Sequence, residues 1–121
     1  MWSADRLLET VRGFQAACAI TAAADLDLFT AIEDGSATAA VIARRVNADP
    51  HAAEVLLDAL VALGLLSKQG DSYHVPSDTA ELLTGDSPTN ILPGVRHQAN
   101  CLRRWAQLAR VVRTGRPAER T

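Results

Sequence analysis

The hydrophobic pattern in the middle of the chain predicts three short helices followed by a hairpin. Between Leu26 and Val75, apolar residues recur every three or four positions in three segments, and two short runs then flank Gln69-Gly70-Asp71. The predicted helices cover residues 26–34, 39–46 and 50–63, and the predicted strands cover residues 65–68 and 72–75. This order predicts a winged helix-turn-helix, which we place at residues 25–76.

Capping residues support the limits of these elements. Asp49 offers a side-chain acceptor at an N-cap, and Pro50 fits the first helical position because its missing N–H is not needed there. The other expected N-caps are Asp25, Thr38 and Ser77, the last for a short helix at 78–83, and the expected C-terminal stops are Gly35 and Gly64.

Two longer helices flank this core in the sequence, at residues 4–23 and 93–114. The first places Leu7, Val11, Phe14 and Cys18 at spacings of four, three and four, which forms a seam along one helix face. Its other apolar residues widen the face beyond what one small domain covers. We therefore predict a homodimer whose interface contains Leu7, Val11, Phe14 and Cys18.

Composition places the chain among ordinary globular proteins. The 121 residues are 48% hydrophobic, 21% charged and only 4% aromatic, which predicts a single, mainly helical domain built on aliphatic residues. No run approaches the length of a membrane span, and the first residues lack a basic signal-peptide region, so we expect no membrane partner and a cytoplasmic location. Cys18 and Cys101 lack metal-ligand spacing and are expected to be buried thiols, with no metal site.

Charge is distributed unevenly along the chain. Residues 1–95 carry thirteen acidic and five basic side chains, whereas residues 96–121 carry seven arginines and one glutamate. Our preferred interpretation is a solvated helix face whose last-turn arginines suit the helix dipole, and a tail for an acidic partner is the alternative.

The predicted recognition helix argues against nucleic-acid binding. Residues 50–63 contain His51, Glu54 and Asp58 but no lysine or arginine, and carboxylates are repelled by the phosphates that line a DNA groove. Arg44, Arg45 and Lys68 supply only a little flanking positive charge. A winged-helix DNA-binding transcription regulator is therefore kept as the alternative function. No glycine-rich phosphate loop, paired carboxylate or nucleophile motif is present, so we predict no catalytic residue.

The segments Leu-Asp-Leu-Phe (26–29), Thr-Ala-Ala-Val-Ile-Ala (38–43) and Leu-Leu-x-Ala-Leu-x-x-Leu-Gly-Leu-Leu (56–66) carry a family resemblance. With the Gly-x-x-Tyr wing and a later Trp-x-x-Leu, they resemble the N-terminal dimerisation domain of class I S-adenosylmethionine-dependent small-molecule O-methyltransferases. That family includes plant phenolic and bacterial polyketide-tailoring enzymes. The resemblance covers nearly all of residues 4–117.

The resemblance implies a role in dimerisation and in roofing an acceptor pocket. The first helix and the linker helix at 93–114 would intertwine with a partner protomer. Residues of the linker helix would bind a small aromatic or polyketide-like acceptor, namely Arg96, His97, Asn100 and Cys101, with Trp105 packing beneath them as core more than as a ligand contact.

The resemblance also implies what this chain does not hold. In the family, S-adenosylmethionine binds a Rossmann-like domain that follows the linker helix, and the 121 residues contain no such domain. We therefore expect no cofactor in this chain, S-adenosylmethionine in a full-length parent, and no catalysis by the chain alone. A further alternative is a free-standing module that pairs with a separate methyltransferase chain.

Overall fold

A computed structural model describes residues 1–32 and 36–120 of the chain. Its elements in order are α1 (Ala4–Arg12), α2 (Phe14–Asp25), α3 (Leu28–Ala31), β1 (Ala37–Thr38), α4 (Ala39–Arg45), α5 (Pro50–Ala62), β2 (Ser67–Gln69), β3 (Ser72–His74), α6 (Ser77–Leu83), α7 (Leu92–Trp105) and α8 (Leu108–Thr114).

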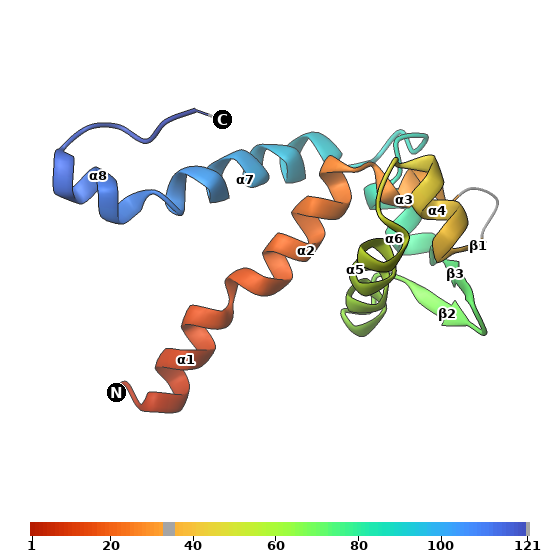
Figure 1. Cartoon of the computed structure of the whole chain (residues 1–121), viewed down its shortest axis with the longest axis horizontal. Helices are drawn as coiled ribbons and strands as arrows, with labels where there is room; N and C mark the ends of the chain where they lie inside the picture. Colours follow the sequence, from red (N-terminus) through yellow and green to blue (C-terminus); the bar gives the residue numbers. More distant parts are fainter. Residues whose placement is uncertain (33–35, 121) are drawn as a thin grey trace.

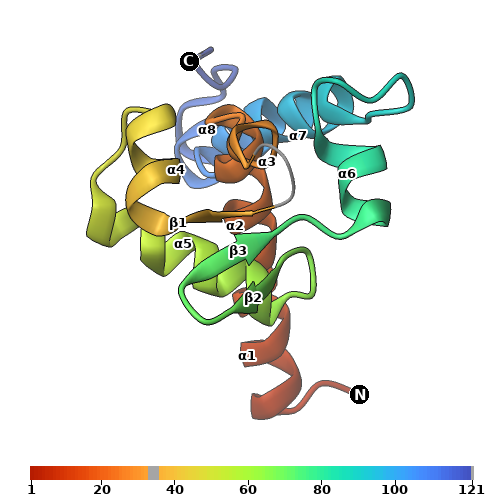
Figure 2. The ribbon, with the colours of Figure 1, turned by 90° about the vertical axis from the view of Figure 1, so that its right-hand side faces the viewer.

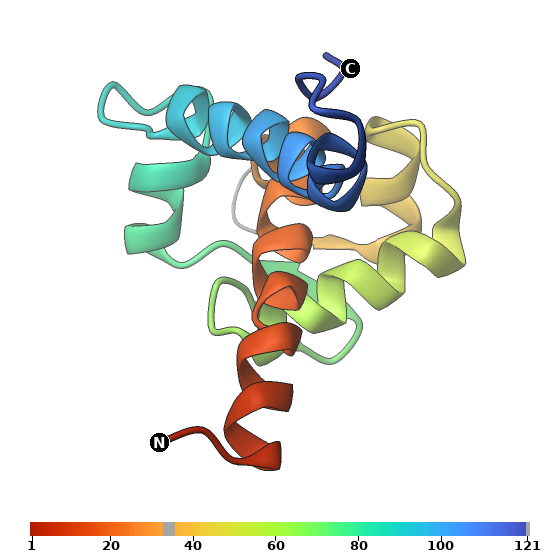
Figure 3. The ribbon, with the colours of Figure 1, turned by 90° about the vertical axis from the view of Figure 1, so that its left-hand side faces the viewer.

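The molecule consists of a winged core and two helical arms (Figure 1). The core contains α3 to α6 and the small sheet, whereas α1–α2 form one arm and α7–α8 form the other. The arms diverge from the core, and α7 crosses the C-terminal end of α2 (Figure 3). The predicted fold class, a mainly helical winged helix-turn-helix with additional terminal helices, is confirmed.

The core is built from the apolar faces that the periodicity predicted. Leu28 and Phe29 of α3, Ile42 of α4, and Leu57 and Leu60 of α5 are all essentially inaccessible to solvent. Their burial at about 25 cal/mol per Å² of apolar surface is the main stabilising contribution, and it holds α4 and α5 in a helix-turn-helix arrangement.

Local caps begin α4 and α5 where the sequence predicted, and Gly64 follows the end of α5. Asp49 Oδ2 accepts a hydrogen bond from the Ala52 amide at 2.8 Å, and Pro50 is the first residue of α5. The Thr38 hydroxyl accepts from the Val41 amide at 3.4 Å at the start of α4. Gly64 follows α5 with φ +80°, a conformation that favours glycine.

The wing contains a strand that the sequence pattern did not predict. β2 and β3 form the expected hairpin around Gly70, and β1 pairs antiparallel with the other edge of β3, with Ala37 opposite Tyr73 (Figure 2). β1 has only two residues, which is too short to show the alternation that identifies a strand.

Each long helix predicted from the sequence is two helices in the structure. The predicted helix at 4–23 is divided at Gly13, whose amide bonds the Thr10 carbonyl at 3.2 Å. The predicted helix at 93–114 begins at Leu92 and is divided near Gln107, whose amide bonds the Arg104 carbonyl at 3.0 Å. Both are i to i−3 bonds, which tighten the backbone locally without changing the apolar spacing.

Two predicted N-caps were wrong. Asp25 is the last residue of α2, and Asp27 precedes α3 in the left-handed conformation with φ 52°. Ser77 is the first residue of α6, and the Thr79 amide bonds the Asp78 carboxylate instead. The predicted stop at Gly35 and the end of the helix predicted at 26–34 lie outside the described residues. Within the described ranges, no helix combines the length and apolar content needed to cross a bilayer.

Leu57→Ala tests the core assignment. Leu57 is completely buried, so its truncation should lower the free energy of unfolding by about 2–5 kcal/mol because a cavity remains. The matched control is Val55→Ala on the same helix, where the side chain is 58% exposed and the change should stay within about 0.5 kcal/mol. Urea denaturation followed by circular dichroism measures both. Equal losses in the two variants would contradict this packing.

Candidate functional site

The α1–α2 arm presents the predicted interface residues to solvent. Leu7, Val11 and Phe14 are 49%, 65% and 55% exposed, and Cys18 is partly buried nearer the core. Leu7 and Val11 lie on one face of α1, which has no buried residue, and Phe14 is the first residue of α2. An apolar row of this length on a free helix is typical of a surface that packs against another molecule.

The α7–α8 arm carries a second exposed apolar row. Trp105, Leu108 and Val112 follow each other at helical spacing and are 70%, 47% and 76% exposed. The prediction that Trp105 packs as core was therefore wrong for the single chain. Most of the Trp105 side chain is therefore in contact with solvent in one protomer.

Two shallow apolar grooves lie beside the arms. One, of about 360 Å³, runs between α2 and α7. It is lined by Ala17, Ile20, Thr21, Ile91, Gly94, Val95 and Gln98. The other, of about 380 Å³, lies between the α1–α2 junction and the end of α5, where small residues such as Ala16, Ala19 and Ala59 form its walls. Small residues at a helix surface allow a second helix to approach closely.

The predicted acceptor residues occupy two neighbouring faces of α7. His97 and Cys101 are one turn apart, with Cys101 Sγ 3.6 Å from His97 Nε2, and Trp105 follows one turn later. Arg96 and Asn100 lie on the adjacent face and contact other protein groups: Asn100 Oδ1 accepts from Arg103 Nη1 at 2.8 Å. Of these four polar residues, His97 is exposed and Cys101 is partly buried, not fully buried as the sequence predicted, and their polar side-chain atoms contact only each other among the described residues.

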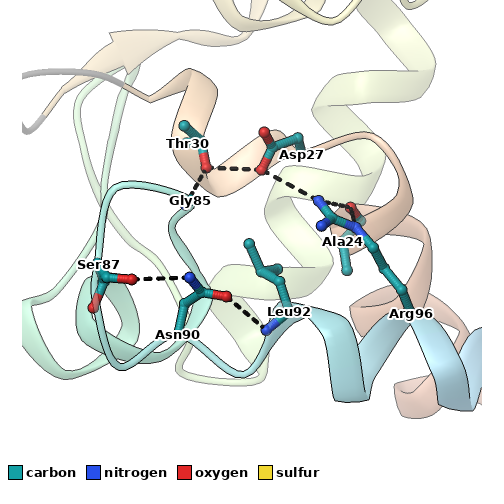
Figure 4. A network of polar contacts seen from close by, with 8 residues as sticks. All are labelled: Ala24, Asp27, Thr30, Gly85, Ser87, Asn90, Leu92 and Arg96. Atoms are coloured by element: carbon teal, nitrogen blue, oxygen red, sulfur yellow. Dashed lines mark hydrogen bonds and ion pairs between the residues drawn. The ribbon is translucent and has the colours of Figure 1, made fainter.

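Arg96 binds the C-terminal end of α2 (Figure 4). Its Nε and Nη2 each donate to the Ala24 carbonyl at 3.3 Å, and Nη2 lies 3.7 Å from an oxygen of Asp27. Arg103 pairs with Asp25 in the same region. Sequence reasoning missed both ion pairs, because residues about seventy positions apart carry no local signal that they meet.

A polar cluster anchors the wing to α5. Asp58 Oδ1 accepts from Tyr73 Oη at 2.5 Å and from Lys68 Nζ at 3.0 Å, and Lys68 Nζ lies 4.9 Å from the centre of the Tyr73 ring. The hydrogen bonds from Tyr73 and Lys68 lower the pKa of Asp58, and the bonds to Tyr73 and Asp58 raise the pKa of Lys68. Burial raises the pKa of Tyr73. The positive charge of Lys68 in the wing is therefore neutralised by Asp58 of α5.

The described residues do not fit S-adenosylmethionine. Among the described residues, the glycines with positive φ are Gly64 and Gly115, which follow helices, and Gly70 at the tip of the wing. None belongs to a strand-to-helix loop that could cradle a nucleotide. No group of three metal-ligating side chains occurs within residues 1–32 and 36–120 either.

Comparison with known proteins places this geometry in a family. Residues 8–86 match the family model of the "O-methyltransferase dimerisation domain". The chain is 34% identical over 110 residues to the N,N-dimethyltransferase OxyT of Streptomyces rimosus, covering 90% of the chain and 32% of OxyT. It is 30% identical over 111 residues to the tetracenomycin polyketide synthesis 8-O-methyl transferase TcmO of Streptomyces glaucescens, covering 90% of the chain and 33% of TcmO.

Solved structures agree with the sequence relatives. The crystal structure of human N-acetylserotonin methyltransferase in complex with SAM superposes with a TM-score of 0.78 and 31% identity, covering 96% of this chain and 36% of that one. The chain therefore belongs to the family of O-methyltransferase dimerisation domains. It spans about a third of the length of the curated relatives it matches.

Asp58→Asn tests the polar cluster through pH. Because the folded-state pKa of Asp58 lies below its ordinary value of 3.8, the ionised carboxylate stabilises the fold above that value, and this stabilisation is lost as pH falls through the folded-state pKa. The difference in unfolding free energy between parent and variant should therefore be largest near neutral pH and shrink under acid. Urea titrations across this range measure it. Glu54→Gln on the same helix is the control, and a pH-independent difference for Asp58→Asn would contradict the cluster.

Proposed function

We propose that this chain is the homodimerisation and acceptor-lid domain of an S-adenosylmethionine-dependent methyltransferase that acts on a small aromatic or polyketide-like acceptor. The observation that carries the proposal is the exposed apolar seam of the α1–α2 arm, with Leu7, Val11 and Phe14 about half or more exposed. Membership of the dimerisation-domain family supports self-association as the use of this seam.

The shape of the arms supports an interlocked pair of protomers. Each chain has bulky apolar side chains on its arms and grooves with small-residue walls beside them. A two-fold related copy can place the protruding residues of one protomer against the grooves of the other, and the same contact is then made twice. Burying the α1 seam and the row at Trp105 removes the largest exposed side chains on both arms from water.

The acceptor role is assigned mainly to His97 and Cys101 on α7. Both are polar and lie one turn apart, and His97 is next in sequence to Gln98, which lines the apolar groove between α2 and α7. A histidine ring can donate to or accept from a phenol or carboxylate, and Trp105 beside them offers a flat apolar surface. Arg96 and Asn100 act behind this face, because Arg96 is bonded to Ala24 and Asp27 and Asn100 to Arg103.

The methyl donor and the chemistry are assigned to the remainder of the methyltransferase. The relatives include enzymes named for O-methyl and N,N-dimethyl transfer, so the acceptor atom is an oxygen or a nitrogen. No observation favours the DNA-binding alternative: α5 presents Glu54 and Asp58 where a recognition helix needs cations, and Asp58 neutralises Lys68 of the wing.

Val11→Glu tests self-association of the 121-residue chain. A carboxylate in a closely packed apolar interface must be desolvated, so the dimer dissociation constant should rise by about tenfold or more. Sedimentation velocity over a concentration series measures it. The matched control is Val55→Glu, another exposed valine, on α5. A parent chain that stays monomeric at its highest soluble concentration would overturn the proposal, as would equal weakening by both variants.

His97→Ala tests the acceptor role in a methyltransferase that carries this domain. Loss of one hydrogen bond to the acceptor should raise KM for the acceptor by about threefold to tenfold and leave KM for S-adenosylmethionine unchanged. Steady-state kinetics with each substrate varied in turn separates the two. Arg104→Ala is the control, because Arg104 lies on the same helix and makes no ion pair with a described residue. An unchanged KM for the acceptor would contradict the proposed hydrogen bond between His97 and the acceptor.

A further inference from the structure

The C-terminal end of α2 concentrates negative charge at the point where α7 crosses it (Figure 3). The last carbonyl groups of a helix lack partners inside the helix and form the negative end of its dipole. Asp25 ends α2, and Asp27 follows in the left-handed conformation, so two carboxylates lie beside these carbonyls. Any cation on the crossing helix is attracted to this end.

Two arginines of α7 occupy this end at separate points. Arg96 donates twice to the Ala24 carbonyl and lies 3.7 Å from Asp27 (Figure 4). Arg103, two helical turns further along, pairs with Asp25 and is itself held by Asn100. The two attachments therefore lie on the same side of α7 and are spaced along its axis.

Small residues make up part of the apolar contact between the helices. Ala99 lies between the two arginines on α7 and is buried, and Ala23 and Ala24 of α2 are buried in one cluster with Leu92 at the start of α7, against which Val95 packs. Large side chains such as Leu92 set a crossing angle by interlocking ridges and grooves, and the alanine part of the contact offers few such ridges. Beyond Val95, groups that bind at defined atoms therefore add to what sets the direction of α7.

We propose that Arg96 and Arg103 are positioning residues that form an electrostatic pivot and set the angle between the two arms. Arg96 fixes the crossing point on the α2 carboxyl end, and Arg103 prevents α7 from rotating about that point. Asp27 is oriented for its part by the Thr30 hydroxyl, which donates to it at 2.7 Å and accepts from the Gly85 amide at 2.8 Å (Figure 4). The pivot thereby also ties the loop before α7 to α3.

The pivot should respond to salt. The paired side chains retain 37% to 49% of their exposure, so counterions reach them and weaken the attraction. A looser pivot changes the direction of the α7–α8 arm while the buried winged core is untouched. The consequence for partner binding rests on the proposed self-association, but the pivot itself is a property of one chain.

Distances between the arms test the pivot directly. Spin labels are attached at Glu9→Cys on α1 and Arg113→Cys on α8, both exposed, in a Cys18→Ser, Cys101→Ser background. Labelled chain is diluted with unlabelled chain so that double electron–electron resonance reports only distances within one protomer. Arg96→Gln and Asp27→Asn should each broaden the distance distribution by about twofold, and high salt should broaden that of the parent.

Matched variants separate positioning from general destabilisation. Arg104→Gln removes an arginine of the same helix that makes no ion pair with a described residue, and it should leave the distribution unchanged. Arg96→Lys keeps the charge but cannot donate to the carbonyl and the carboxylate as a guanidinium does, so it should give partial recovery. Circular dichroism melting of each variant confirms that the core stays folded.

The outcomes are distinct from those of the proposed function. If Arg96→Gln and Asp27→Asn give the same distribution as Arg104→Gln, the pivot is overturned, whatever the oligomeric state. If the parent chain is monomeric in sedimentation but Arg96→Gln broadens the distribution, the pivot holds and the homodimer proposal fails.

Discussion

The packing of the last turn of α2 is the contact on which the rest of this structure depends. Ala23 and Ala24 are completely buried there, whereas α1, at the beginning of the same arm, has no buried residue. One arm is thus held at one end, and α7 crosses at the same place with Ala99 buried. This contact, together with the packing of α2 on α5, positions the exposed residues of both arms, and so positions the surface proposed for dimerisation.

This arrangement separates stability from recognition. The winged core buries Leu28, Ile42, Leu57 and Leu60 completely and uses local caps, so its stability comes largely from contacts within one chain. The arms instead expose the side chains that most favour leaving water, from Phe14 on one arm to Trp105 and Val112 on the other. Such a division suits a domain whose arms gain their packing only by association.

Electrostatics follows the same division. In the wing, Asp58 neutralises Lys68 and is bonded by Tyr73, which reduces the positive charge that the wing presents. On the arms, the arginines of α7 meet the acidic end of α2. The uneven charge along the chain is therefore partly balanced within one molecule, where basic residues after position 95 pair with acidic residues before it.

The sequence by itself determined the features that depend on neighbours within about four residues. Helical periodicity identified the buried faces, Asp49 and Gly64 marked the limits of α5, and the motifs around Leu56–Leu66 carried the family resemblance. The tertiary structure decided what depends on distant residues: the third strand paired to β3, the exposure of Trp105, and the contact of Arg96 with Ala24. Periodicity predicts which face of a helix is apolar, but only the tertiary structure shows how much of that face is buried within one chain.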